Sequence, residues 1–135
     1  MLLRRACLLS LVVSLLGFVA CSEDDSLTGV WTGAFKDSLG GLGGGSLTFS
    51  QMSGVSLSGS WQVIYQTFAG KAAYNNSGTL SGSTAGNAIT AVMTSQGGCS
   101  FALQATRSGN DMTGSYTSTD CATSQTGTID LTKMP

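Results

Sequence analysis

The sequence has no histidine, a single proline and few charged residues, and each shortage narrows the possible functions. Without histidine, the chain cannot build a Ser-His-Asp or Cys-His nucleophile or a histidine metal site. Charged residues make up 10% of the chain, the net charge is −1, and no lysine run or basic patch is present. A nucleic-acid partner is therefore not expected, because phosphate binding needs clustered positive charge.

The chain begins with a short apolar run that is typical of an export signal. Arg4 and Arg5 precede the run from Ala6 to Ala20, which passes directly into Cys21 and an acidic stretch. A charged start, a short apolar middle and small residues at the end describe a secretory signal peptide. The run is shorter than the roughly 20 residues that a membrane-spanning helix needs. Residues 1–20 are therefore predicted to be a helical signal peptide that is removed.

The end of this signal, Phe18-Val19-Ala20-Cys21, resembles the lipobox of bacterial lipoproteins. The resemblance implies that Cys21 receives a diacylglycerol, becomes the new N-terminus and holds the protein on a membrane through acyl chains such as palmitate. Ser22 stands where lipoproteins retained at the inner membrane tend to carry Asp, so the resemblance implies the outer membrane. The alternative is an ordinary cleaved signal followed by an incidental cysteine.

The rest of the chain is rich in glycine, serine and threonine, with its one proline at the last position. Apolar and polar residues alternate most clearly from Val55 to Val63, with Leu57, Gly59 and Trp61 on the apolar face. Alternation with a period of two predicts strands with one buried and one wet side. We expect eight strands, over residues 28–36, 46–51, 55–65, 77–82, 88–94, 99–106, 111–118 and 124–133. The segments 37–45 and 66–76 are expected to be long connections.

A short internal repeat supports a closed sheet. Its inward positions read large, glycine, large in the copies Leu27–Trp31, Leu57–Trp61, Leu80–Thr84 and Met112–Tyr116, and more weakly in Thr126–Ile129. An inward glycine lets a strand coil sharply and leaves room for a neighbouring ring. Alternating large and small inward residues are how a small barrel fills its interior. The predicted fold is all-β: an acidic tether over residues 21–26, then an eight-stranded antiparallel up-and-down β-barrel over residues 27–135. A β-sandwich is the alternative.

Two further cysteines test this layout. A hairpin centred near Ser108-Gly109 brings Cys99 and Cys121 to the same end of the sheet. An even pair in an exported protein predicts a disulfide. Two cysteines without histidine make a metal site unexpected, and no cofactor is predicted.

The stretch Ser26-Leu27-Thr28-Gly29-Val30-Trp31-Thr32 is similar to the opening strand of the avidins, and Gly29-Val30-Trp31 resembles the Gly-x-Trp signature of lipocalins. Both families are eight-stranded barrels that hold a small molecule in the barrel mouth. The chain departs from the avidin pattern at Gly33 and Asp37 and lacks the later tryptophans of the biotin site, so biotin binding is not expected. Small periplasmic inhibitors of metalloproteases are a third family of short barrels with one disulfide.

Catalysis is not expected. The candidate carboxylates Asp37, Asp111, Asp120 and Asp130 are predicted to lie in turns or on outward faces, and no two form a pair on one inner face.

Two non-catalytic functions remain open. The first is binding of a small hydrophobic ligand at the barrel mouth, with walls from Trp31, Phe35, Trp61 and Tyr116 and a lid of Phe68 and Tyr74. The second is a structural or protein-interaction module of the cell envelope, for example an inhibitor of a protease, with a fully packed core. A binding barrel would contain an apolar cavity of about 300 Å³ or more. In either role Arg107 or Lys133 is predicted to stack on Trp31.

Overall fold

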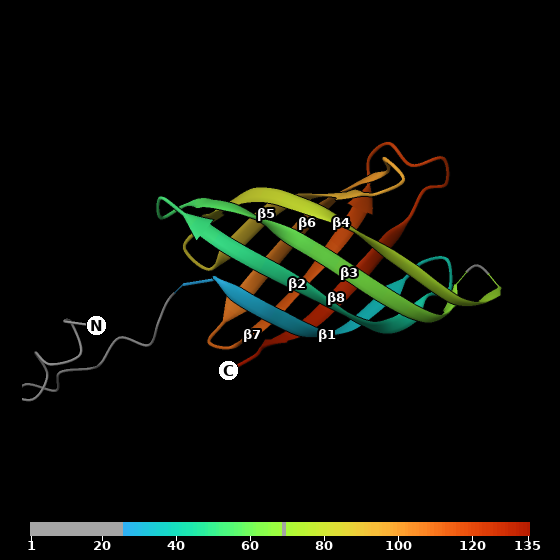
Figure 1. Ribbon diagram of the computed structural model, residues 1–135, viewed down its shortest axis with the longest axis horizontal. Helices are drawn as coiled ribbons and strands as arrows, with labels where there is room; N and C mark the ends of the chain where they lie inside the picture. Colours follow the sequence, from blue (N-terminus) through green and yellow to red (C-terminus); the bar gives the residue numbers. More distant parts are fainter. Residues whose placement is uncertain (1–25, 69) are drawn as a thin grey trace, which may run out of the picture.

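The computed structural model describes residues 26–68 and 70–135, which form a β-barrel (Figure 1). The signal peptide at residues 1–20, its expected helix, the lipidation site Cys21 and the tether up to residue 25 lie outside the described residues. The strands are β1 (Gly29–Asp37), β2 (Leu42–Met52), β3 (Ser56–Phe68), β4 (Lys71–Ala85), β5 (Ala88–Ser95), β6 (Ser100–Ser108), β7 (Asp111–Ser118) and β8 (Thr126–Lys133). In this part of the chain no helix is long and apolar enough to cross a membrane.

The sheet closes on itself. Each strand pairs antiparallel with the next, and β1 also pairs with β8, from Trp31 opposite Lys133 to Asp37 opposite Gly127. This closure confirms the eight-stranded up-and-down barrel and rules out the β-sandwich alternative. It also removes the unpaired edges that a sheet of short, mostly uncharged strands would otherwise expose.

The prediction of long connections over residues 37–45 and 66–76 is wrong. Strand β2 begins at Leu42, within the glycine-rich segment, and strands β3 and β4 continue to Phe68 and from Lys71. The run from Val63 to Phe68 is aromatic and β-branched, so it favours strand over loop. Tyr65 pairs with Tyr74 across this hairpin, which places Tyr74 on a strand and not in a loop.

The interior is filled by the inward residues of all eight strands. Trp31, Leu47 and Leu103 are fully buried, and Trp61 and Val63 are nearly so, as the alternation predicts. The other buried apolar side chains are Leu27, Phe35, Phe49, Leu57, Tyr65, Leu80, Ile89, Ala91, Met93, Phe101, Ala105, Met112, Tyr116, Ile129 and Leu131. The prediction that Val55 begins the buried face of this strand is wrong. Val55 precedes β3 in the turn and is 60% exposed, because alternation holds only where the strand is paired.

Inward glycines let the strands approach closely. A Cβ atom on Gly59 would collide with the carbonyl oxygen of Thr48 on the neighbouring strand. A Cβ atom on Gly127 would collide with the ring of Tyr116. These contacts confirm the role that the repeat predicts for glycine, since one position admits a neighbouring backbone and the other a neighbouring ring.

One end of the barrel is closed over Trp31. The guanidinium carbon of Arg107 lies 5.8 Å from the centre of the indole ring, and Nζ of Lys133 lies 5.9 Å from it. The indole Nε1 donates a hydrogen bond to the carbonyl of Leu27 (3.0 Å). Both predicted cation–π partners are therefore present, and they cover the ring at this end.

The disulfide between Cys99 and Cys121 is present, as predicted, with the two Cα atoms 4.8 Å apart. It joins the start of β6 to the loop between β7 and β8. That loop is also held by Asp120, whose carboxylate accepts the backbone N–H of Ser100 (2.6 Å).

Replacing Gly59 by alanine is expected to destabilise the barrel, because the new methyl group has no space beside Thr48. Overpacking of this kind costs about 1–3 kcal/mol, measured as the free energy of unfolding in urea. Gly44→Ala is the matched control, since the nearest atom to its Cβ position is 3.7 Å away. Equal stability of the two variants would contradict the close approach of β2 and β3.

Replacing both cysteines by alanine is expected to lower the free energy of unfolding by about 3 kcal/mol, through the added entropy of the unfolded chain. Chemical denaturation of the C99A/C121A variant measures this, with the wild-type protein under reducing conditions as a second reading. A stability unchanged by both treatments would argue against the disulfide.

Candidate functional site

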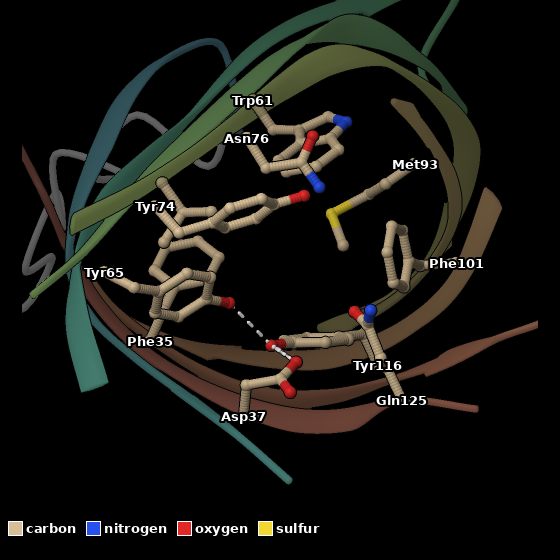
Figure 2. Close-up of a pocket in the computed structure, with 11 residues that line it drawn as sticks. Phe35, Asp37, Trp61, Tyr65, Tyr74, Asn76, Met93, Phe101, Tyr116 and Gln125 are labelled. Atoms are coloured by element: carbon tan, nitrogen blue, oxygen red, sulfur yellow. Dashed lines mark hydrogen bonds between the residues drawn. The ribbon is translucent and has the colours of Figure 1, made fainter. Parts of the chain in front are cut away.

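The barrel has two dissimilar ends. We use "terminal rim" for the end where the described chain begins and ends, together with the turns β2–β3, β4–β5 and β6–β7 and the strand residues next to them (Figure 1). We use "mouth" for the opposite end, where β1, β3 and β7 finish and β4 begins. Polar and aromatic side chains gather at the mouth (Figure 2).

A chain of hydrogen bonds crosses the mouth. The hydroxyl of Tyr116 donates to Oδ2 of Asp37 (2.7 Å), and the hydroxyls of Tyr65 and Tyr116 are 2.9 Å apart (Figure 2). Because the one hydroxyl proton of Tyr116 is donated to Asp37, the hydroxyl of Tyr65 donates the second hydrogen bond to the oxygen of Tyr116. The chain links β1, β3 and β7, which are far apart in the sequence, and it satisfies both buried phenols.

The two tyrosines are held neutral. Burial raises the pKa of Tyr65 to about 12, helped by the negative charge of Asp37 and offset in part by the hydrogen bond with Tyr116. Burial also raises the pKa of Tyr116 far above its ordinary value, and the hydrogen bonds with Tyr65 and Asp37 add to the shift. Neither phenol can therefore act as a base or nucleophile near neutral pH.

Aromatic rings surround this chain of hydrogen bonds. Phe101 makes edge-to-face contacts with both Trp61 and Tyr116, with ring centres 6.0 and 5.7 Å apart. Tyr74 stacks on Tyr65 with ring centres 6.4 Å apart and is 39% exposed, so it presents one face of its ring to solvent at the mouth. Such pairs hold rings in fixed positions.

The space between these side chains is small. The pocket at the mouth offers only about 10 Å³ to the centre of a water molecule, which is about what one water needs. It is lined by Phe35, Asp37, Trp61, Val63, Tyr65, Tyr74, Asn76, Met93, Phe101, Tyr116 and Gln125. Nε1 of Trp61 is buried beside this pocket without a hydrogen-bond partner among the described residues.

Four of the six residues proposed as ligand contacts meet at the mouth: Phe35, Trp61, Tyr74 and Tyr116. Trp31 lies away from it, fully buried at the terminal rim beneath Arg107 and Lys133. The backbone places Phe68 at the end of β3, and its side chain lies outside the described residues.

Sequence reasoning missed Tyr65 and the position of Asp37. Asp37 was expected in a connection and Tyr65 only as the end of a strand, yet both point into the mouth. Each lies two residues beyond a buried neighbour, Phe35 and Val63, so extending the alternation by one step would have placed them on the inner face. Asn76 lies four residues before the buried Leu80 on β4, so the alternation also reaches it, whereas Gln125 carried no such signal.

The cysteines offer no metal centre in this state. Sγ of Cys99, Sγ of Cys121 and a carboxylate oxygen of Asp120 lie within 4.8 Å of one another. The two sulfur atoms are bonded to each other, so neither is a thiolate that could bind a metal.

Alkaline pH is expected to destabilise the protein through the mouth tyrosines. The pKa of Tyr65 is about 12 in the folded protein and about 10 in the unfolded chain. The free energy of unfolding is therefore unaffected by this group below pH 10 and falls as the pH rises from 10 towards 12. The free energy of unfolding, measured in urea between pH 8 and 12, should fall less steeply in Tyr65→Phe and Tyr116→Phe. Phe49→Leu changes the core without changing a titrating group, so its free energy of unfolding should fall with pH as steeply as in the wild type. Equal slopes in all variants would contradict the raised pKa of the buried tyrosines.

No protein-family model matches the sequence, and a comparison with curated proteins gives no match either. Among solved structures, a redesigned β-barrel is similar, with a TM-score of 0.55 and 19% sequence identity. The similarity covers 81% of this chain and 92% of the designed one. At this identity the likeness supports the small β-barrel fold alone.

Proposed function

We propose that the protein is a non-catalytic, lipid-anchored protein of the cell envelope, held in the outer membrane through Cys21, whose packed barrel presents its mouth to a protein or glycan partner. The anchor rests on the lipobox-like sequence at residues 18–21. The barrel serves as a rigid support, and the recognition surface is the mouth.

The observation that carries this proposal is the filled interior. The pocket of about 10 Å³ is far smaller than the 300 Å³ or more that a small-molecule site takes. An enclosed ligand in the barrel mouth, as the resemblance to avidins and lipocalins implied, therefore has no room in this conformation. Recognition then falls to side chains that reach solvent.

The chemistry of the mouth suits a polar partner. Tyr74 offers an exposed aromatic face, and Asp37, Asn76 and Gln125 offer hydrogen-bonding groups beside it. Tyrosines held in place by packing contribute contact area at a small entropic cost, which is why they are frequent in recognition surfaces. Aromatic faces with amide and carboxylate neighbours can bind either a peptide or a sugar.

Two features argue against catalysis. Asp37, the carboxylate that lines the pocket, accepts its hydrogen bond from a tyrosine that stays neutral. The whole sequence lacks histidine, the usual general base near neutral pH. The mouth therefore has no evident acid–base pair.

A second candidate is binding of a small hydrophobic ligand at the mouth, favoured by one observation. The indole N–H of Trp61 is buried without an acceptor, and leaving such a donor unsatisfied costs about 1–3 kcal/mol. A ligand with an oxygen acceptor could satisfy it if Tyr74 and Asn76 moved apart to enlarge the pocket.

The proposal is tested by native mass spectrometry of the full-length gene product, purified from membranes in mild detergent. We expect the mass of a chain that begins at Cys21 and carries acyl groups, without a retained small molecule. Cys21→Ser should abolish the acylated species. A retained small molecule would favour the second candidate, and an unacylated Cys21 would refute the anchor.

Recognition at the mouth is tested by placing a photoreactive amino acid at Tyr74 in living cells. Irradiation should give a discrete product of higher mass from position 74. Val92, 48% exposed on the outer face of β5, is the matched control and should give none. Equal crosslinking at both positions would count against the mouth as the recognition surface.

A further inference from the structure

We infer that the terminal rim rests against the lipid bilayer, so that the mouth points away from the membrane. This inference rests on the proposed anchor at Cys21 and adds which end of the barrel meets the lipid. It follows from where the chain enters the barrel, how far Cys21 can lie from that point, and which side chains surround it.

The point of entry is fixed by the first described residues. Leu27 is buried, and its N–H donates to Oε1 of Gln51 on β2 (2.9 Å). On the other side, Nζ of Lys133 on β8 donates to the carbonyl of Ser26 (2.8 Å). The described chain is thus held between the ends of β2 and β8 from Ser26 onward.

The tether is short compared with the barrel. From Cys21 to Leu27 the chain spans at most about 22 Å when fully extended, at 3.3–3.6 Å per residue. The strands beside the point of entry, β1 and β8, have 9 and 8 residues, and with a rise of about 3.3 Å and a tilt of about 40° they cover roughly 20–23 Å along the barrel axis. A tether drawn back to the level of the mouth would have to be fully extended along the barrel wall, so acyl chains on Cys21 enter the bilayer on the side of the terminal rim.

Exposed apolar side chains flank the point of entry on both sides. Met52, the last residue of β2, and Val55, in the turn before β3, are 61% and 60% exposed. Val30 and Met134 are 37% and 52% exposed and lie together, since the N–H of Met134 donates to the carbonyl of Val30 (2.8 Å). Contact with the interface of a bilayer would remove these side chains from water.

The charges near this rim give no attraction to an anionic lipid surface. Arg107 is buried and lies over Trp31 together with Lys133, while Glu23, Asp24 and Asp25 of the tether are acidic. The apolar contacts and the length of the tether therefore carry the orientation. Apolar residues are also exposed near the mouth, Leu42 and Tyr74 among them, so the length of the tether decides between the two ends.

The test uses the full-length, processed protein in vesicles of phosphatidylethanolamine and phosphatidylglycerol that contain a nitroxide-labelled lipid. A single cysteine is introduced at Val55→Cys, and separately at Leu42→Cys, and labelled with an environment-sensitive fluorophore. Both positions carry exposed aliphatic side chains at opposite ends of the barrel, so neither change touches the core. We expect several-fold stronger quenching and a larger blue shift at position 55 than at position 42.

The other outcomes overturn the inference. Equal quenching at both positions would mean that the barrel lies on its side, and stronger quenching at position 42 would mean that the mouth faces the lipid. An acylated protein without quenching at position 55 would place the rim away from the bilayer and leave the anchor intact. Absence of an acyl mass on Cys21 would refute the anchor, and this orientation would fall with it.

Discussion

Pairing between β1 and β8 is the constraint on which the rest of the structure depends. It joins the first and last strands of the chain, from Trp31 opposite Lys133 to Asp37 opposite Gly127. Closure at this small diameter forces the strands to coil tightly, and inward glycines such as Gly59 and Gly127 supply the space. The same pairing brings Lys133 over Trp31 and Gly127 under Tyr116, so it also shapes both ends of the barrel.

The interior is filled, and the two ends of the barrel carry different side chains. The mouth carries a hydrogen-bonded chain of Tyr65, Tyr116 and Asp37 beneath an exposed Tyr74. The terminal rim carries two cations over Trp31 and a set of exposed apolar side chains around the point where the chain enters. The two ends therefore differ in chemistry, and the proposed function uses one for attachment and the other for recognition.

The sequence predicted the barrel because its strands repeat a simple pattern. From Leu57 to Val63 every second residue is apolar or glycine, and those positions are buried or partly buried in the structure. The sequence-based prediction of strand boundaries failed where glycines replaced the apolar residues of the pattern. Glycines at positions 43–45 suggested a loop, yet a paired strand tolerates them where the ring of Phe35 lies against Gly45. The hairpin between β3 and β4 was also predicted as a loop, because polar residues and alanines interrupt the alternation over residues 66–76.

The sequence by itself determined the fold class and the disulfide, because each depends on local alternation or on two cysteines brought together by a short hairpin. The cations over Trp31 were predicted from residue type, but they reach the ring only because β1 and β8 pair. Only the tertiary structure decided that the interior is full and that Asp37 and Tyr65 share the mouth. Those facts depend on how side chains from β1, β3 and β7 meet across the barrel. The volume left between them is set by the diameter and packing of the closed sheet, which no single strand encodes.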